Sequence, residues 1–474
     1  MKIAALRFAS TRMARHIQDQ GVKTPMLQDM NRHFTMGGLI KFTLPTIAMM
    51  IFTSLYNVVD GIFVSNFVGK TALAAVNLIW PLIMIFASVG LMMGAGGSAL
   101  IAKTRGEGDD ARANRYFSLV VVFTVLLGLV LLVVGQVVMV DAMALMGAGG
   151  QLLDETVVYG RIVMAALPFF ALQFAFQTLF STAGKPIYGF YVIVAAGLTN
   201  AVLDALFICG FGWGLPGAAI ATALGQVVGG VVPIVYFCRR NSSFLRLTKP
   251  RWEWRPIGRA CVNGVSELVS NVAMSVVAML YNFQLLSYIG EDGVAAYSVI
   301  GYTAMIFGAI FMGYATGASP LMSYQYGAKN HAEMRSILLK SLAFVGSLSV
   351  VMFVAAECLA PALSAIFVGY DPELLEFTAN AYRIYAVAFL LMGIPIYGSA
   401  FFTALNNGLV SALIAFLRTM LFECGAVLLL PLVLGPDGIW CSVFVAEAAA
   451  AVITVLFIVG LRNVYGYGRK AARK

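Results

Sequence analysis

The segment LPTIAMMIFTSLYNVVDGIFV, residues 44–64, is an apolar run that contains a single acid, Asp60. Its length matches the roughly 20 apolar residues that a helix needs to cross the hydrocarbon layer of a membrane. A second apolar run, VAAGLTNAVLDALFICG at 194–210, contains Asp204. A carboxylate in the middle of a bilayer costs roughly 2.5–3.5 kcal/mol on insertion scales. Acids in such positions usually serve ion binding, proton transfer or cation recognition.

The composition of the whole chain indicates a membrane protein. Of its 474 residues, 60% are hydrophobic and 11% are charged, whereas soluble domains carry about 25% charged residues. We therefore expect an all-α polytopic membrane protein without a separate soluble domain. Apolar runs of spanning length predict twelve transmembrane helices, at about 39–65, 73–101, 116–141, 157–182, 187–209, 216–238, 261–288, 295–322, 337–367, 378–404, 409–433 and 438–461.

The chain repeats itself at a spacing of 221 residues, because VGKTALAAVNLI (68–79) matches IGEDGVAAYSVI (289–300). Each repeat contains six spans, so both have the same orientation in the membrane. This predicts two six-helix lobes related by a pseudo-two-fold axis along the membrane normal, with a cavity between them. The predicted division is a tail at 1–35, an N-terminal lobe at 36–238, a linker at 239–259, a C-terminal lobe at 260–462 and a basic tail at 463–474.

Lysine and arginine are unevenly distributed along the chain, whose net charge is +9. They concentrate in both tails, in 103–115, in 239–259 and near 329–340, while the intervening loops contain few. By the positive-inside rule, both termini and the linker are cytoplasmic and the protein lies in the cytoplasmic (inner) membrane. The basic segments could contact anionic membrane lipids. The sequence has no aromatic and basic surface suited to nucleic acid.

Five polar residues in three predicted spans form the candidate ion site. Tyr56 and Asp60 are four residues apart, as are Asn200 and Asp204, so each pair shares one helix face. Thr222 lies on the next span. Two nearby buried carboxylates cannot cheaply ionise together, so this group could hold a proton or a small cation. In the alternative interpretation, each aspartate only bonds a neighbouring helix.

Further polar residues are candidates for the substrate cavity, and one proline is a candidate hinge. The cavity candidates are Asn57, Gln177, Glu267 and Asn282, and the hinge candidate is Pro45, which lies on the Asp60 helix. A proline in a membrane helix can kink it or free a carbonyl group.

The C-terminal lobe does not repeat the acid pair. At a spacing of 221, Asp60 corresponds to Tyr281, while Asn200 and Asp204 correspond to Leu421 and Gly425. This lobe has its own acids, of which we interpret Glu357, Glu423 and Glu447 mainly as helix-packing residues. Glu423 follows Arg418 by five residues and could form an internal ion pair with it.

Catalytic and nucleotide-binding motifs are missing from the sequence. The three histidines lie outside the predicted spans, the six cysteines are scattered, and there is no HExxH or P-loop sequence. We therefore expect that the protein is not an enzyme and that it needs no cofactor or resident metal.

Several motifs together resemble those of the multidrug and toxic compound extrusion (MATE) family. The resemblance covers about residues 36–462. The motifs are Leu44-Pro45 followed by Tyr56-Asn57-x-x-Asp60, the sequence ALAAV at 72–76, AGKP at 183–186, Asn200-x-x-x-Asp204, and GAAxAT at 217–222.

The resemblance implies a secondary antiporter that expels amphipathic organic cations by alternating access, and we expect a monomer. The chain is most similar to the bacterial DinF-type and MepA-like branch. That similarity implies that Tyr56, Asp60, Asn200, Asp204 and Thr222 bind the coupling ion, either H+ or, at the two aspartates, Na+. A C-terminal sodium site, which another branch uses, is disfavoured because span ten has no acid after Glu376.

The alternative within the same superfamily is a flippase for lipids or lipid-linked oligosaccharides. Such proteins often carry many basic residues in their cavity. Here the spans contain only Arg161 and Arg383 near their outer ends, and Arg418. This composition disfavours an anionic lipid substrate.

Overall fold

The computed structural model describes residues 33–68, 70–146, 148–368 and 371–468. The chain divides into two units, Met1–His33 and Phe34–Lys474, and the second contains all the helices that follow. The described residues form helices and no strands. The N-terminal half comprises α3 (Met36–Phe67), α4 (Lys70–Gly106), α5 (Asp110–Leu145), α6 (Gln151–Ala165), α7 (Leu167–Thr182), α8 (Pro186–Asp204), the π-helical turn η1 (Ala205–Gly210) and α9 (Gly214–Cys238).

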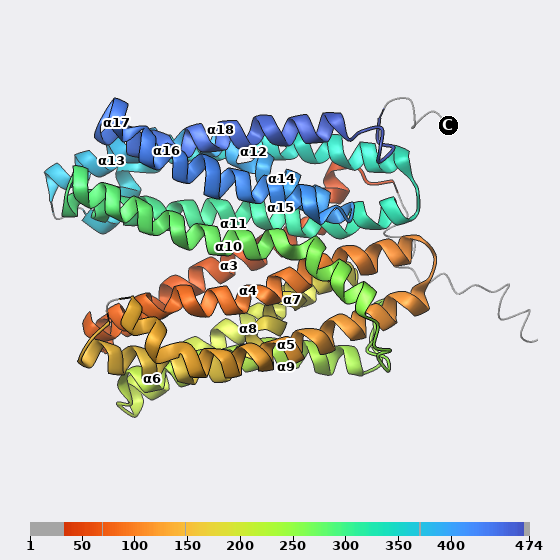
Figure 1. Cartoon of the computed structure of the whole chain (residues 1–474), viewed down its shortest axis with the longest axis horizontal. Helices are drawn as coiled ribbons and strands as arrows, with labels where there is room; N and C mark the ends of the chain where they lie inside the picture. Colours follow the sequence, from red (N-terminus) through yellow and green to blue (C-terminus); the bar gives the residue numbers. More distant parts are fainter. Residues whose placement is uncertain (1–32, 69, 147, 369–370, 469–474) are drawn as a thin grey trace, which may run out of the picture. The chain divides into compact units, whose positions relative to one another are not determined.

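The C-terminal half follows the same order after a linker without helices. It comprises α10 (Trp254–Tyr288), α11 (Glu291–Gly327), α12 (His331–Val368), α13 (Pro372–Ala386), α14 (Phe389–Ala404), α15 (Gly408–Phe416), the π-helical turn η2 (Leu417–Glu423), α16 (Cys424–Leu429), α17 (Pro431–Leu434) and α18 (Pro436–Gly460). Figure 1 shows the helices α3–α9 and α10–α18 as two bundles, which we call the N-terminal and C-terminal lobes.

The prediction of twelve spans in two six-helix lobes is confirmed. Ten helices in the described part of the chain are long and apolar enough to cross a membrane, and two bent helix pairs bring the number to twelve. The predicted boundaries of the tails and linker remain predictions. Of the predicted linker, residues 239–253 lie between α9 and α10, and the rest belongs to the start of α10.

Two spans that were predicted as single helices are broken. The span at 157–182 divides into α6 and α7 with a bend of 59°, and the span at 378–404 divides into α13 and α14 with a bend of 47°. Pro168 lies at the start of α7, where its ring and missing N–H group interrupt a continuing helix. The second bend occurs without a proline at the break.

Several helices begin where the sequence provides a cap. The carboxylate of Asp109 accepts a hydrogen bond of 2.9 Å from the backbone N–H of Arg112 at the start of α5. The side chain of Asn407 likewise accepts from the N–H of Val410 at the start of α15. Such bonds satisfy N–H groups that have no partner within the helix, so these loops fix where the spans begin.

The two lobes meet through α4, which packs on α10 and α11, and through α3, which packs on α11. Backbone atoms approach closely between Gly96 on α4 and Ala260 on α10. A Cβ atom on Gly96 would lie 1.9 Å from the Ala260 carbonyl oxygen, and one on Gly264 would lie 1.9 Å from that of Met92. Small residues permit such backbone contact between membrane helices.

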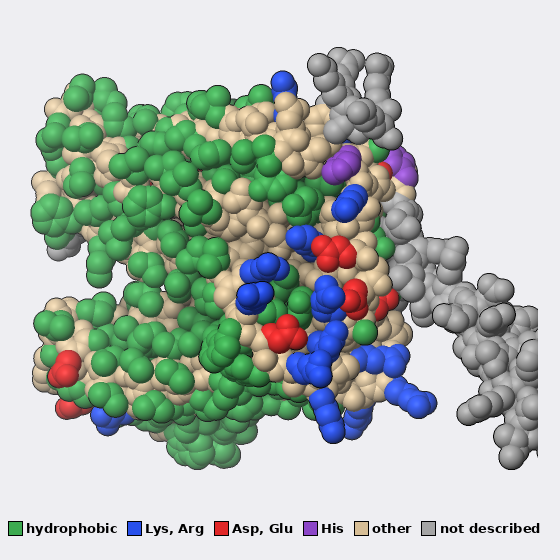
Figure 2. All heavy atoms as spheres, turned by 45° about the vertical axis from the view of Figure 1, so that its right-hand side comes forward, with side chains coloured by type: hydrophobic (Ala, Val, Ile, Leu, Met, Phe, Trp, Pro, Cys, Tyr) green, Lys and Arg blue, Asp and Glu red, His purple; other side chains and the backbone are tan. Residues whose placement is uncertain are grey.

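The other end of the molecule is open. Figure 2 shows Lys and Arg side chains gathered at one end of the described residues, which we call the basic end. At the opposite end the same view shows a cleft between the two lobes. The lobes are therefore closed against each other towards the basic end and separated away from it.

Candidate functional site

Tyr56 of α3 packs against α8. A Cβ atom on Gly197 of α8 would lie 3.5 Å from Cγ of Tyr56 and 2.9 Å from Cε1 of Phe52. A side chain at position 197 would therefore push the Phe52 ring away from the backbone of α8 and would contact the Tyr56 ring. The absence of a side chain there lets α3 and α8 approach at the predicted ion site.

Asn200 and Thr222 connect α8 to α9. The side-chain amide of Asn200 donates a hydrogen bond of 3.4 Å to the hydroxyl of Thr222, and both residues are 2% exposed. A Cβ atom on Gly225 would lie 3.1 Å from Cβ of Asn200, which shows how closely the two helices approach. The structure therefore brings these two predicted residues together in the interior of the N-terminal lobe.

Asp204 is the last residue of α8 and is fully buried. It lies one helical turn after Asn200, on the same face of the helix. The π-helical turn η1 begins at the next residue, and such turns occur frequently at functional sites. The carboxylate is thus held in the protein interior rather than exposed to the lipid.

Asn57 and Asp60 lie on α3, within one turn after Tyr56. Their side chains lie outside the part of the chain that the structure describes. The meeting of the carboxylates of Asp60 and Asp204 therefore remains a prediction.

Three buried glutamines lie on α7 and α9 of the N-terminal lobe, and the sequence analysis missed two of them. Gln226 of α9 lies one turn after Thr222, and neither polar atom of its amide has a hydrogen-bond partner among the described residues. The same holds for Oε1 of Gln173 and Nε2 of Gln177 on α7. Buried amides usually have partners, and those without one mark places where water or a ligand completes the bonding.

The position of Gln173 connects these amides to α9. A Cβ atom on Gly229, three residues after Gln226, would lie 2.5 Å from Oε1 of Gln173. The predicted cavity residue Gln177 follows on the same face of α7 and is 3% exposed, so it is directed into the lobe. The sequence does contain a signal for such residues, namely a glutamine in an otherwise apolar span, as Gln226 is in ATALGQ.

The other predicted residues lie elsewhere. Glu267 is half-buried on α10, where its backbone carbonyl accepts a hydrogen bond from Asn271, and Asn282 is exposed near the end of the same helix. Pro45 lies inside α3, which is one continuous helix from Met36 to Phe67. The structure does not bring these residues together with Asn200 and Thr222, and their predicted roles remain untested.

The C-terminal lobe contains an ion pair at the level of the membrane. Nη2 and Nε of Arg418 donate hydrogen bonds of 2.6 and 2.9 Å to Oε1 of Glu447. The side chain of Glu447 is 4% exposed and that of Arg418 is 24% exposed. The expected partner of Arg418 was Glu423, and this is wrong, because α18 places Glu447 directly opposite the guanidinium. An ion pair that joins two helices agrees with the interpretation of Glu447 as a helix-packing residue.

A single spacing of 221 does not relate the fifth spans of the two lobes, so the assignment of Leu421 as the counterpart of Asn200 is also wrong. Helix α15 begins 222 residues after α8. The turn η2 then adds one residue within the span, because a π-helical turn holds more residues than an α-helical one. At the end of η2 the spacing is therefore 223, and Glu423 occupies the place of Asn200, which precedes the corresponding turn η1.

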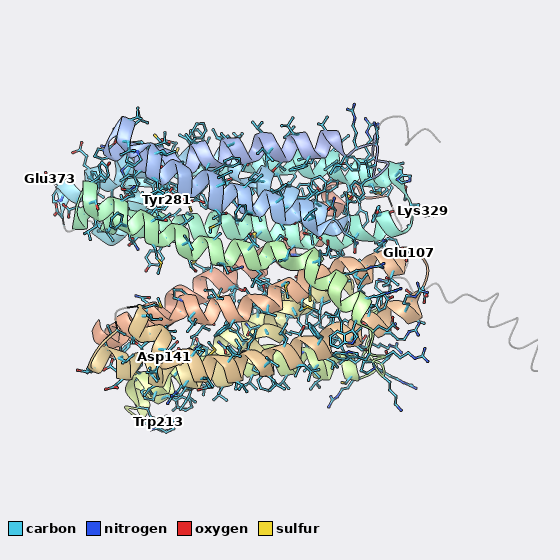
Figure 3. All side chains as sticks on the ribbon, in the orientation of Figure 1. Glu107, Asp141, Trp213, Tyr281, Lys329 and Glu373 are labelled. Carbon is cyan, nitrogen blue, oxygen red and sulfur yellow. The ribbon has the colours of Figure 1, made fainter. Side chains whose placement is uncertain are left out.

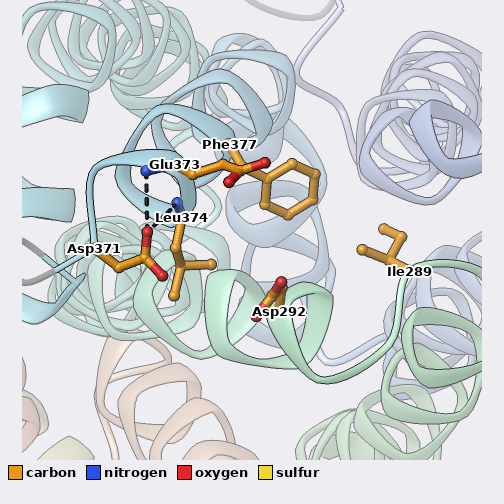
Figure 4. Close-up of a pocket in the computed structure, with 6 residues that line it drawn as sticks. All are labelled: Ile289, Asp292, Asp371, Glu373, Leu374 and Phe377. Carbon is orange, nitrogen blue, oxygen red and sulfur yellow. Dashed lines mark hydrogen bonds between the residues drawn. The ribbon is translucent and has the colours of Figure 1, made fainter.

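A small acidic pocket lies at the end of the C-terminal lobe, between the first turns of α11 and α13. It encloses about 180 Å³ and is lined by Ile289, Asp292, Asp371, Glu373, Leu374 and Phe377 (Figure 4). One oxygen of Asp371 accepts bonds from the backbone N–H groups of Glu373 and Leu374, so this carboxylate caps α13. The pocket lies apart from the polar residues of the N-terminal lobe.

Comparisons with known sequences give a consistent result. The sequence model of the MatE family matches residues 45–206 and 268–425. The chain is 23% identical over 428 residues to the multidrug export protein MepA of Staphylococcus aureus (strain MSSA476), which covers 90% of this chain and 94% of that protein. It is 22% identical over 431 residues to MepA of Staphylococcus haemolyticus (strain JCSC1435), with coverage of 90% and 93%.

Solved structures share the fold. A multidrug resistance MATE family transporter of the MOP superfamily in an outward-facing conformation superimposes with a TM-score of 0.85 and 22% identity, covering 93% of this chain and 99% of that chain. A MATE structure in a bent conformation gives a TM-score of 0.87 and 21% identity, with coverage of 95% and 100%. The arrangement of two six-helix lobes is therefore that of these transporters.

Proposed function

The chain belongs to the MatE family, as its motifs predict, and on this basis we propose that it is an antiporter that exports organic cations in exchange for H+ or Na+. The curated relatives with the same fold are multidrug export proteins. Membership of a family of transporters agrees with the expectation that the protein is not an enzyme. Its substrates are amphipathic cations, and it works as a monomer in the cytoplasmic membrane.

The observation that carries this proposal is the buried polar group in the N-terminal lobe. Asp204 is fully buried, one turn from the hydrogen bond between Asn200 and Thr222. A carboxylate in such surroundings is costly unless it is hydrogen-bonded, takes up a proton or binds a cation. In this proposal Asp204 and Asp60 bind the coupling ion, and Tyr56, Asn200 and Thr222 complete its surroundings.

The open cleft supports alternating access. By the positive-inside rule the basic end faces the cytoplasm, so the cleft in Figure 2 faces outwards. From this state an ion binds between α3 and α8, and α3 bends near Pro45 as the organic cation leaves. The lobes then separate at the basic end, where Gly96 and Gly264 now hold α4 against α10.

Four polar residues are proposed as contacts for the substrate. Asn57, Gln177, Glu267 and Asn282 retain this proposed role, which their positions on α3, α7 and α10 permit. The flippase alternative gains no support from Arg418, because Glu447 neutralises this arginine. Membrane lipids surround the helices, and the basic linker contacts their headgroups.

Transport by reconstituted protein tests the proposal. Proteoliposomes loaded with ethidium would be given either a pH gradient or a Na+ gradient, and dye movement would be followed by fluorescence. Asp60→Asn and Asp204→Asn should lose gradient-driven transport. Asp141→Asn is the matched control, because Asp141 is exposed on α5. Undiminished gradient-driven transport by either site variant removes that aspartate from the mechanism.

A further inference from the structure

The carboxyl group of Glu423 has no ion-pair partner of its own among the described residues. Glu423 lies at the end of η2, five residues after Arg418, but the Arg418 guanidinium is engaged with Glu447 by three hydrogen bonds. No other side chain that the structure describes forms an ion pair with Glu423. Two carboxylates thus share one guanidinium. A surplus charge at bilayer depth must be neutralised by a proton or a bound cation.

Three tyrosines from three helices lie near this carboxylate. Tyr281 of α10 and Tyr297 of α11 are stacked, with ring centroids 4.7 Å apart and an angle of 12° between the rings. Tyr385 of α13 completes the set, and all three lie within electrostatic range of Glu423. Aromatic faces combined with a carboxylate are the groups that bind organic ammonium ions.

The hydroxyl of Tyr281 gives a second, independent indication of a ligand. Tyr281 is 1% exposed, and its hydroxyl has no hydrogen-bond partner among the described residues. Figure 3 places it within the C-terminal lobe, on the half away from the basic end. A buried hydroxyl without a partner is uncommon and indicates a group supplied from outside the protein.

This cluster occupies the same place in its lobe that the ion site occupies in the other. Glu423 stands where Asn200 stands, because of the extra residue in η2. Glu447 stands where Gln226 stands, since Gly214 at the start of α9 and Gly435 just before α18 both have a positive φ and are 221 residues apart. In the C-terminal lobe, polar side chains of the fifth and sixth spans therefore lie at positions that correspond to Asn200 and Gln226 of the N-terminal lobe.

We propose that Glu423 and the three tyrosines form a binding site for a monovalent organic cation in the C-terminal lobe. The Arg418–Glu447 pair fixes one side of this site, and the aromatic faces of Tyr281, Tyr297 and Tyr385 contact the apolar part of the cation. A proton neutralises Glu423 when the site is empty. The proposal rests on the proposed export of organic cations and assigns the ion and the substrate to different lobes.

Equilibrium binding of ethidium tests this site without transport. The full chain would be purified in nanodiscs of zwitterionic lipid, with no ion gradient, and titrated by fluorescence anisotropy. Glu423→Gln should weaken ethidium binding by about tenfold or more, because it removes the charge and retains the shape. Glu357→Gln is the control, since Glu357 lies on α12, which contributes no residue to the site. Unchanged binding by Glu423→Gln overturns the proposal.

A second measurement uses the unaltered protein and decides the question if Glu423→Gln does not fold. Carbodiimide labelling of carboxyl groups, read by mass spectrometry, should decrease at Glu423 when ethidium saturates the protein. Labelling of Glu423 that is the same with and without ethidium overturns the proposal.

The Asp204→Asn variant separates this inference from the proposed function. It should bind ethidium as tightly as the unaltered protein while losing gradient-driven transport. Normal transport by the unaltered protein together with normal binding by Glu423→Gln refutes only the site in the C-terminal lobe. An unaltered protein that neither binds nor transports an organic cation refutes the proposed function as well.

Discussion

The hydroxyl of Ser323 on α11 donates a hydrogen bond of 2.6 Å to the backbone carbonyl of Ala99 on α4. This bond joins the two lobes in the half of the molecule where they are closed. The side-chain amide of Asn406 donates to the same carbonyl oxygen at 3.3 Å. One backbone carbonyl of α4 therefore accepts hydrogen bonds from two side chains of the opposite lobe. Both bonds must break when the lobes separate at this end.

The substitution Ser323→Ala should favour opening at the basic end. Loss of one buried hydrogen bond costs the closed state about 1 kcal/mol, or about a factor of five in population. The measurement is the distance between spin labels at Glu107 and Lys329, both exposed at this end (Figure 3), in a background without native cysteines. We expect a larger fraction of long distances. An unchanged distribution would show that this bond does not hold the lobes together.

The substitution Gly264→Ala should prevent the lobes from closing at the basic end. The added Cβ would lie 1.9 Å from the carbonyl oxygen of Met92, a distance that no backbone tolerates. We expect ethidium transport to fall by more than about tenfold, because alternating access needs both closed states. Gly258→Ala on the same helix is the control, since no heavy atom lies within 4 Å of its added Cβ. Equal transport by both variants contradicts the prediction.

The sequence predicted the fold because span length and the internal repeat do not depend on contacts between helices. The run at 44–64 and its eleven counterparts have the length of membrane helices. The break before Pro168 was not predicted, because proline is often tolerated within membrane helices. Tertiary contacts decide whether a proline is tolerated within the helix or breaks it, and the pattern of apolar residues does not indicate these contacts.

The candidate site was predictable in part. Asn200 and Thr222 were correctly grouped, because polar residues in apolar spans are few and tend to meet. The pairing of Arg418 with Glu447 was missed, since a choice between two carboxylates depends on helix rotation. The π-helical turn η2 rotates the end of its span by one residue, and no periodicity in the sequence indicates where such a turn lies.

The substitution Thr222→Val should weaken coupling-ion binding while leaving the fold intact. Valine has the shape of threonine but cannot accept the hydrogen bond from Asn200, so the amide loses this link to α9. Loss of one such bond predicts that the ion concentration for half-maximal transport rises by about fivefold. Thr199→Val is the control, because the hydroxyl of Thr199 bonds only to the Ala195 carbonyl of its own helix. Identical ion dependence in both variants excludes a role for the Asn200–Thr222 bond.

The substitution Glu447→Gln should destabilise the C-terminal lobe and weaken ethidium binding together. Removing one partner of a buried ion pair is costly, and the partial exposure of Arg418 reduces the expected loss to about 1–3 kcal/mol. Arg418 would then turn towards Glu423, which neutralises the charge proposed to hold the organic cation. Thermal unfolding followed by intrinsic fluorescence measures the first effect, and anisotropy measures the second.

The double substitution Arg418→Met with Glu447→Leu separates these two effects. Replacement of a buried ion pair by apolar residues is often neutral for stability, so the double variant should regain most of the lost thermal stability. Glu423 would then remain as a charged residue without a competing guanidinium, and ethidium binding should be at least as tight as in the unaltered protein. A double variant that is stable but binds no ethidium would mean that Arg418 positions the site rather than competing for Glu423.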